Sequence, residues 1–124
     1  MNQSTQSYKD LIVWQKGIEL AKAIYKMTRS FPAEEKFSLV SQMRRAAISI
    51  PSNIAEGQAP RRTTPEFIQF VTHAQGSTAE LDTQIILAVE LNFCPKKSVL
   101  PIYELTDEIR RMLNALHRKL AERL

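Results

Sequence analysis

The sequence predicts an all-α fold: an antiparallel, up-down-up-down bundle of four helices. Apolar residues recur at steps of three and four in four separate segments, which is the spacing of one buried helix face. The 124 residues include only three glycines, and few runs alternate with period two, which argues against a sheet with many tight turns. The length suits one domain. We expect a flexible N-terminal tail over residues 1–7 and a bundle over residues 8–124, with helices at about 8–29, 35–58, 64–92 and 98–122.

The first helix carries two neighbouring apolar seams. The seam expected to face the core contains Leu11, Trp14, Ile18, Ala21, Tyr25 and Thr28. The second seam contains Val13, Gly17, Leu20, Ile24, Met27 and Phe31. Two seams are wide for a surface helix of a monomer, so we expect part of this surface to meet another subunit. Phe31-Pro32 ends the helix, because proline disfavours helical geometry in the residue before it.

The second helix is expected to start near Glu34 or Glu35 and to kink at Pro51, which removes a backbone donor and crowds the carbonyl four residues earlier. Asn53 falls beside the apolar seam and needs a partner. We expect Asn53 or Ser49 to bond a carbonyl freed by the proline or to reach the third helix; a recognition site at the kink is the alternative. The expected core seam is Val40, Met43, Ala47, Ile50 and Ile54.

The third helix begins with a capping box, because Thr63 is followed three residues later by Glu66. Gly76 and Ser77 in mid-helix lower helix propensity and indicate close approach of a neighbouring helix. Asn92 can adopt the left-handed geometry that ends a helix. The predicted core seam is Phe67, Val71, Ala74, Thr78, Leu81, Ile85 and Ala88.

The fourth helix is expected to begin between Ser98 and Ile102, because proline is tolerated only in the first turn and Pro101 lies there. Its apolar face consists of Ile102, Leu105, Ile109, Met112, Leu113, Leu116 and Leu120. Short connections between long amphipathic helices favour antiparallel neighbours.

The sequence predicts no catalytic residues, no metal site and no cofactor. Neither His73 nor His117 has a glutamate three residues before it, so the di-iron motif of helical bundles is absent. The single cysteine, Cys94, is expected to be a small buried side chain near a helix end. The sequence lacks a Gly-rich phosphate loop and a Gly-x-Ser-x-Gly elbow. With one cysteine, no signal-like N-terminus and no run of about 18 apolar residues, we expect a cytoplasmic protein.

One enzyme interpretation stays open. The segment from Arg111 to His117 resembles the Arg-x(4–6)-His motif of the HEPN ribonucleases, which are also helical bundles. The imidazole would act as acid or base on RNA, and the arginine would stabilise phosphate charge. Met112 stands where that motif usually has a polar residue, and the segment is short enough to match by chance.

The charge is unevenly distributed. The net charge is +4, but residues 63–92 contain no Lys or Arg and four acids. The basic residues outside that segment are candidates for phosphate contacts. We expect nucleic-acid binding by Lys16, Lys22, Lys26, Arg29, Arg44, Arg45, Arg61, Arg62, Arg110, Arg111, Arg118 and Lys119.

Several segments resemble the 23S ribosomal RNA intervening-sequence proteins, also called the four-helix-bundle protein family. The most specific is the block from Arg44 to Gly57, Arg-Arg-Ala-Ala-Ile-Ser-Ile-Pro-Ser-Asn-Ile-Ala-Glu-Gly. The match covers residues 8–93 well and the last helix loosely. Ser38 and Asn92 stand where the family often has glycine. Further matching segments are Leu11–Lys16, Phe31-Pro32, Glu35–Leu39, Phe67–Phe70, Gly76-Ser77 and Glu80-Leu81.

The resemblance implies a bundle with left-handed twist that assembles as a ring-like homopentamer, in a bacterial family without a settled molecular activity. Some members are encoded within insertions of ribosomal RNA genes. The family is similar to the accessory variability protein of diversity-generating retroelements, a basic pentameric bundle that binds nucleic acid and the reverse transcriptase.

Three functional hypotheses follow. The leading one is a non-enzymatic, oligomeric protein that binds nucleic acid, with RNA favoured over DNA, or acts as an adaptor through its basic surfaces. Its binding would be mainly non-specific, since few aromatic side chains are expected to be free to stack bases. The second is a protein assembly module in which the acidic third helix of one subunit meets a basic helix of the next. The third is the HEPN-like ribonuclease. No membrane partner is expected.

Overall fold

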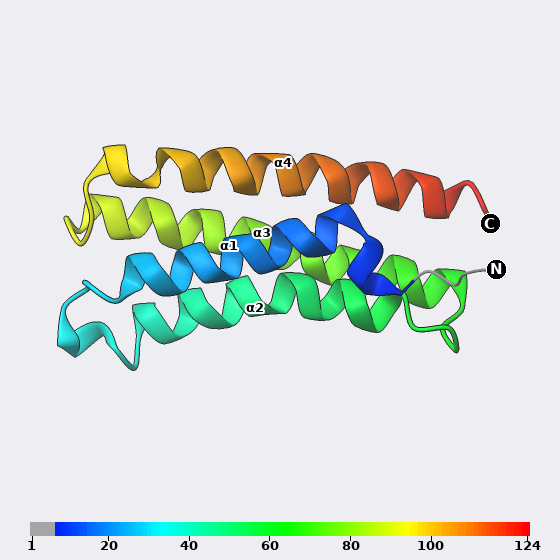
Figure 1. Cartoon of the computed structure of the whole chain (residues 1–124), viewed down its shortest axis with the longest axis horizontal. Coiled ribbons are helices and arrows are strands. Elements are labelled where there is room, and N and C mark those ends of the chain that lie inside the picture. The colour runs from blue at the N-terminus through cyan, green and yellow to red at the C-terminus, as the bar shows by residue number, and fades with distance from the viewer. Residues whose placement is uncertain (1–6) are drawn as a thin grey trace.

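A computed structural model describes residues 7–124, so most of the predicted tail lies outside the described residues. The helices are α1 (Ile12–Thr28), α2 (Leu39–Gly57), α3 (Thr64–Glu90) and α4 (Lys96–Ala121), with short 3₁₀ helices η1 (Tyr8–Asp10) and η2 (Ala33–Glu35). Residues 7–124 contain no strand. Successive α-helices run in opposite directions along one long axis (Figure 1). The all-α four-helix bundle is confirmed; its left-handed twist stays a prediction.

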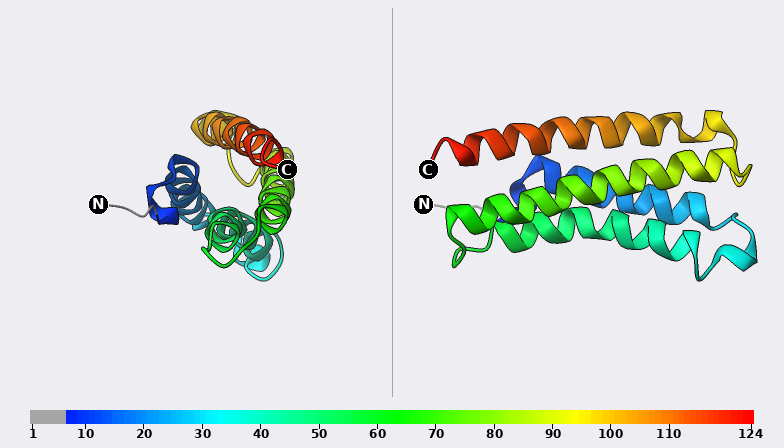
Figure 2. Two further views of the ribbon diagram at one scale, coloured as in Figure 1. Left: turned by 90° about the vertical axis from the view of Figure 1, so that its right-hand side faces the viewer. Right: turned by 180° about the vertical axis from the view of Figure 1, so that it is seen from behind.

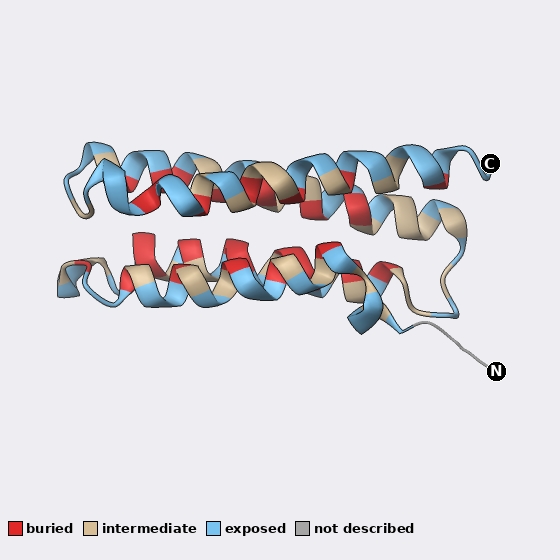
Figure 3. Cartoon of the chain, turned by 45° about the horizontal axis from the view of Figure 1, so that its top comes forward, coloured by how far each residue is buried: buried red, intermediate tan, exposed pale blue. Residues whose placement is uncertain are grey.

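The four helices surround one apolar core. Each helix packs against its neighbours in sequence, and α1 also packs against α4. The end-on view in Figure 2 shows this arrangement around a common axis. Buried residues face inward on all four helices, and exposed residues face out (Figure 3). The largest fully buried side chains are Leu20, Ile24, Met43, Ile50, Ile54, Val71, Leu81, Ile85, Val99, Ile109, Leu113 and Leu120.

Two details of α1 correct the sequence prediction. The helix begins at Ile12 rather than at residue 8, because Leu11 has extended backbone geometry (φ −75°, ψ 126°). Before Leu11 the chain forms η1, whose start is stabilised by a capping box at Ser7. The seam that faces the core is the one that begins at Val13. Ile18 and Tyr25, from the seam expected to be buried, are each 37% exposed.

α2 begins at Leu39, after η2 and a turn, rather than at residue 35. The helix continues through Pro51, which is buried against α1. Gly17 makes this contact possible: a Cβ at Gly17 would lie 3.2 Å from Pro51 Cδ. All five residues of the predicted α2 core seam are buried.

The polar groups near Pro51 find partners inside the bundle. The Asn53 amide donates to the Ser49 carbonyl and to Ser49 Oγ, both at 2.8 Å. Ser49 Oγ lies 2.8 Å from Ser77 Oγ of α3. The expected contact with α3 is therefore present, and it engages the Asn53 amide in a structural role.

The ends of α3 match the sequence prediction. Thr63 and Glu66 form the capping box, and Asn92 has a left-handed φ of 63°. The expected close approach of a helix is wrong for Gly76, where a Cβ would meet nothing within 4 Å, but is present at Ser77, whose Oγ lies 2.8 Å from Ser49 Oγ of α2. α2 also approaches α3 closely at Gly57, where a Cβ would lie 2.8 Å from Phe67 Cδ1.

α4 starts earlier than expected, at Lys96 directly after Pro95. Pro101 therefore lies inside the helix rather than in its first turn. Pro95 has extended geometry (φ −74°, ψ 145°) and serves as the N-cap residue, and Ser98 Oγ donates to its carbonyl at 2.7 Å. The start of the helix is thus set by Pro95 rather than by Pro101.

Candidate nucleic-acid interface

The structure divides the twelve predicted cations into those engaged within the chain and those left free. Lys16 Nζ lies 3.4 Å from a Glu108 carboxylate oxygen and ties α1 to α4. Arg111 lies 3.3 Å from Asp107, and Asp107 also pairs with Arg110. These carboxylates already balance the positive charge. The engaged cations are Lys16, Arg44, Arg62, Arg110 and Arg111.

Arg62 belongs to the structure of the connection between α2 and α3. Its guanidinium lies 3.1 Å from Glu56 and 3.8 Å from Glu66, and it stacks 4.7 Å from the centroid of Phe70. The pKa of the Glu66 carboxyl is lowered, chiefly because the carboxylate accepts a hydrogen bond from the backbone of Thr63. Arg62 therefore links α2 to α3 through these contacts.

Arg44 holds α2 against α1. Its Nε donates to Thr28 Oγ1 at 3.0 Å, and a terminal nitrogen donates to the Tyr25 carbonyl at 3.3 Å. The guanidinium also lies 4.4 Å from the Tyr25 ring centroid, within cation–π range. Because no carboxylate pairs with Arg44 among the described residues, its positive charge is still felt at the surface beside it.

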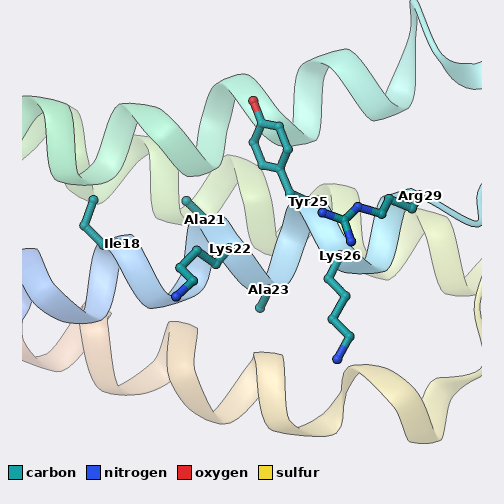
Figure 4. Close-up of a pocket in the computed structure, with 7 residues that line it drawn as sticks. All are labelled: Ile18, Ala21, Lys22, Ala23, Tyr25, Lys26 and Arg29. Carbon is teal, nitrogen blue, oxygen red and sulfur yellow. The ribbon is translucent and has the colours of Figure 1, made fainter.

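Four predicted cations on α1 and α2 remain unpaired. Within residues 7–124, no carboxylate lies within salt-bridge distance of Lys22, Lys26, Arg29 or Arg45. Figure 4 shows Lys22 and Lys26 on α1 and Arg29 directly after it, around a hollow in which Tyr25 points toward α2 and Lys26 points toward α4. This α1 hollow has a volume of about 570 Å³ and is lined by Ile18, Ala21, Lys22, Ala23, Tyr25, Lys26 and Arg29.

A second hollow adjoins the first at Tyr25 and runs between α1 and α2. We call it the α1–α2 groove. Its volume is about 590 Å³, and it is lined by Tyr25, Lys36, Phe37, Val40, Ser41, Arg44, Arg45, Ile48 and Ser49. Within the part of the chain that the structure describes, no acidic side chain lines either hollow. Together they form one basic face with apolar and aromatic side chains between the cations.

The opposite end of the bundle has a different character. Arg118 and Lys119 are exposed and border a groove between η1, α1 and α4. Asp10 and Glu122 border the same groove, so its charge is mixed. Arg61 lies apart from both surfaces, in the connection between α2 and α3. The twelve cations therefore do not form one continuous site.

The structure also describes the groups considered for chemistry. Within the described residues, no three His, Cys, Asp or Glu side chains come together in a way that could hold a metal ion. Cys94 is half-buried, and this burial raises the pKa of its thiol, which disfavours the nucleophilic thiolate. His117 is half-buried, and Arg111 is engaged by Asp107. Six residues apart on a helix, Arg111 and His117 leave α4 in directions about 120° apart.

Comparison with protein families identifies the chain's relatives. The family model for the 23S rRNA-intervening sequence protein matches residues 9–115. The chain belongs to this family. The match includes α1, α2 and α3, both hollows and most of α4, and it confirms the resemblance seen in the segments between Leu11 and Leu81.

A solved structure has a similar fold. It is a protein of unknown function from the S23 ribosomal protein family of Bacteroides thetaiotaomicron. The two chains share 22% identity with a TM-score of 0.76, over 86% of this chain and 98% of the other. At this identity the likeness shows the fold alone. No curated protein sequence matches this member of the 23S rRNA-intervening sequence protein family.

Sequence reasoning missed two residues of the basic face. Lys36 and Phe37 follow η2 and precede α2, and Phe37 is 88% exposed with Lys36 Nζ 5.5 Å from its ring centroid. Phe37 is one of only two aromatic side chains among the exposed large apolar residues that the structure describes, the other being Tyr25 at 37%. The available signal was the Glu35–Leu39 segment that carries part of the family resemblance. The helix predicted from residue 35 includes Phe37, whereas in the structure Phe37 lies in the turn before α2 and faces solvent. None of the described helices is long and apolar enough to cross a bilayer.

Proposed function

We propose that this member of the 23S rRNA-intervening sequence protein family is a non-enzymatic, cytoplasmic protein that binds nucleic acid through the basic face of α1 and α2. The observation that carries the proposal is the separation of charges. Four other predicted cations pair with carboxylates and two border a groove of mixed charge, whereas those around the two adjoining hollows have no acidic neighbour among the described lining residues. The paired cations are Lys16, Arg62, Arg110 and Arg111, and those in the mixed groove are Arg118 and Lys119. The family description, which refers to ribosomal RNA, favours RNA over DNA.

Counterion release supplies the physical basis of this binding. Each phosphate that is neutralised by a Lys or Arg releases condensed cations, so affinity falls steeply as salt rises. Assembly strengthens the effect: a chain of net charge +4 becomes about +20 in the homopentamer that the family resemblance implies. A ring would also present several copies of the basic face to one strand, which raises avidity without any new type of contact.

A pair of charge-matched variants tests the proposal. Lys22→Ala/Arg45→Ala removes two free cations from the basic face, and Arg118→Ala/Lys119→Ala removes two from the mixed groove. We expect the first variant to lose about tenfold in affinity for a single-stranded RNA at low salt, and its plot of log affinity against log salt to be shallower by about 1.4. The control should change much less.

Two results would refute the proposal. One is an absence of RNA binding at low ionic strength while the oligomer is intact. The other is an equal loss of affinity in the two variants, since binding would then reflect net charge rather than this face. Cleavage of RNA by the purified wild-type chain, lost on His117→Ala, would replace the proposal by the ribonuclease alternative.

A protein assembly module is the second candidate, and the outer surface of α3 favours it. Ile86, Leu87 and Leu91 are each about half-exposed there, and a Cβ at Gly76 would meet open space. α3 carries no Lys or Arg, so it would suit the basic helix of a neighbouring copy. If the basic face served only this contact, Lys22→Ala/Arg45→Ala would dissociate the oligomer in sedimentation experiments and RNA would not bind to the wild type.

A further inference from the structure

Phe37 is the most exposed large apolar side chain among the described residues, at 88%, yet it is carried by an ordered turn. Backbone hydrogen bonds close the segment on both sides: Lys36 N–H donates to the Ala33 carbonyl at 3.1 Å, and Ser38 N–H donates to the Glu35 carbonyl at 3.1 Å. Ser38 Oγ also donates to the Glu35 carboxylate at 2.9 Å. The ring is therefore held in solvent by fixed backbone rather than by a loose loop.

Single exposed apolar residues are common on protein surfaces, so exposure alone indicates no function. The surroundings of Phe37 are what distinguish it. The ring borders the α1–α2 groove, with the Lys36 ammonium 5.5 Å from its centroid and Arg45 in the same lining. Glu34 and Glu35 lie on η2 beside the turn, but neither lines the groove. An aromatic face between unpaired cations is the combination that binds unpaired nucleotides.

We infer that the α1–α2 groove is a site for single-stranded nucleic acid, in which one base stacks on Phe37 and the adjoining phosphates lie near Lys36 and Arg45. This inference rests on the proposed function and names its substrate class. A base in a duplex is stacked between its neighbours and cannot offer a face to the ring, so the ligand must be unpaired at this position. The phosphates on either side of that base would meet the positive charge of the groove.

The size and polarity of the groove fit this ligand. Its volume of about 590 Å³ lies in the range of pockets that hold small organic ligands, of which one nucleotide is an example. Ser41 offers a hydroxyl to a base edge or a phosphate. Tyr25 borders the groove but is only 37% exposed and has the Arg44 guanidinium 4.4 Å from its ring centroid, so Phe37 is the more accessible ring on this side.

Protein docking is the competing use of an exposed ring. A protein partner would have to be acidic, because the lining contains three cations and no acid. Each nucleotide carries a negative phosphate, which suits the cations of the groove, and an aromatic base, which suits the exposed ring. Nucleic acid therefore matches both features of the groove in every repeating unit. A protein partner, including a second copy of this chain, is treated as an outcome of the experiment below.

The test compares three oligonucleotides of equal length: a single strand with bases, an abasic single strand and a duplex. The abasic strand keeps the phosphates and lacks the stacking surface. We expect the wild-type chain to prefer the base-bearing strand to the abasic strand by about tenfold, which corresponds to about 1.4 kcal/mol. Phe37→Ala should remove this preference and leave the affinity for the abasic strand unchanged. Phe37→Leu, which keeps apolar bulk without an aromatic face, should behave like Phe37→Ala.

A fluorescence signal reports the stacking directly. Phe37→Trp should retain the preference, and the base-bearing strand should quench its emission more than the abasic strand does. The chain contains one native tryptophan, Trp14, so the wild type supplies the background. Because Phe37 is 88% exposed, these variants should unfold at the same temperature as the wild type.

The outcomes separate the inference from the proposal on which it rests. No binding of any strand at low salt would refute both. Equal wild-type affinity for the base-bearing and abasic strands, or a preference that survives Phe37→Ala, would refute the stacking site while the basic face retains its function. Dissociation of the oligomer by Phe37→Ala, or loss of an acidic protein partner without any change in strand preference, would assign the ring to a protein contact and also overturn the inference.

Discussion

The packing of α2 against α3 makes a sharp prediction at Gly57. A Cβ at this position would lie 2.8 Å from both Phe67 Cδ1 and Phe70 Cβ. Carbon atoms in contact are about 3.5–4.0 Å apart, so each contact requires a retreat of roughly 0.7 Å or more. Phe70 Cβ is attached directly to the α3 backbone, and a rotamer change cannot move it. Gly57→Ala must therefore separate the two helices locally.

The expected size of the effect follows from two opposing terms. Overpacking of this kind costs about 1–3 kcal/mol. The higher helix propensity of alanine offsets at most about 1 kcal/mol, and less at the last residue of a helix. We expect Gly57→Ala to lower the free energy of unfolding by about 1–2 kcal/mol, which corresponds to a fall in Tm of about 3–8 °C for a chain of this length.

Gly76→Ala is the matched control, since the same substitution on α3 meets nothing within 4 Å. It should raise the free energy of unfolding by about 0.5–1 kcal/mol through helix propensity alone. The assay is urea denaturation followed by circular dichroism, at one fixed protein concentration because assembly shifts apparent stability. A Gly57→Ala variant as stable as the wild type would refute the argument. Sedimentation of Gly76→Ala checks whether a neighbouring subunit approaches that position.

Four further predictions concern particular side chains. Arg44→Ala should lower the free energy of unfolding by about 1–3 kcal/mol, because it leaves Thr28 Oγ1 without its charged donor; an unchanged urea midpoint would contradict this. Thr63→Ala should cost about 0.5–2 kcal/mol in the same assay, and equal stability of the two proteins would contradict the cap. Glu66 has a folded pKa below its ordinary value, so its contribution is present above the unfolded pKa and is lost as pH falls through the folded one; the stability difference between wild type and Glu66→Gln should vanish in acid. Cys94, whose thiol pKa is raised by burial, should react with iodoacetamide at neutral pH more slowly in the native than in the urea-unfolded chain, and equal rates would contradict that burial.

Local chemistry explains why much of the fold could be predicted. The apolar period of α2 predicted its five core residues correctly, because a helix with one apolar stripe must bury that stripe. These residues are Val40, Met43, Ala47, Ile50 and Ile54. The Thr63–Glu66 cap and the left-handed Asn92 were also predictable, since both depend on residues within a few positions of each other. The family resemblance in the block from Arg44 to Gly57 pointed to the same bundle.

Periodicity alone could not choose between the two seams of α1. Both have helical spacing, and in the structure the buried seam is that of Val13, on the side where Gly17 faces Pro51 of α2. Gly76 and Gly57 show the same limit: propensity marks a glycine as costly, but only the neighbouring helix decides which glycine is needed for contact.

The same distinction between local sequence and tertiary structure applies to the candidate site. The sequence by itself determined that the chain is a basic four-helix bundle with its cations outside the 63–92 segment. Only the tertiary structure decided which cations are free, because ion pairs such as Lys16–Glu108 and Arg110–Asp82 join residues that are far apart in sequence. It also decided that Phe37 faces solvent, since the turn before α2 sets its direction. Helical period is a local property of the chain, whereas charge pairing and exposure depend on which segments the fold brings together.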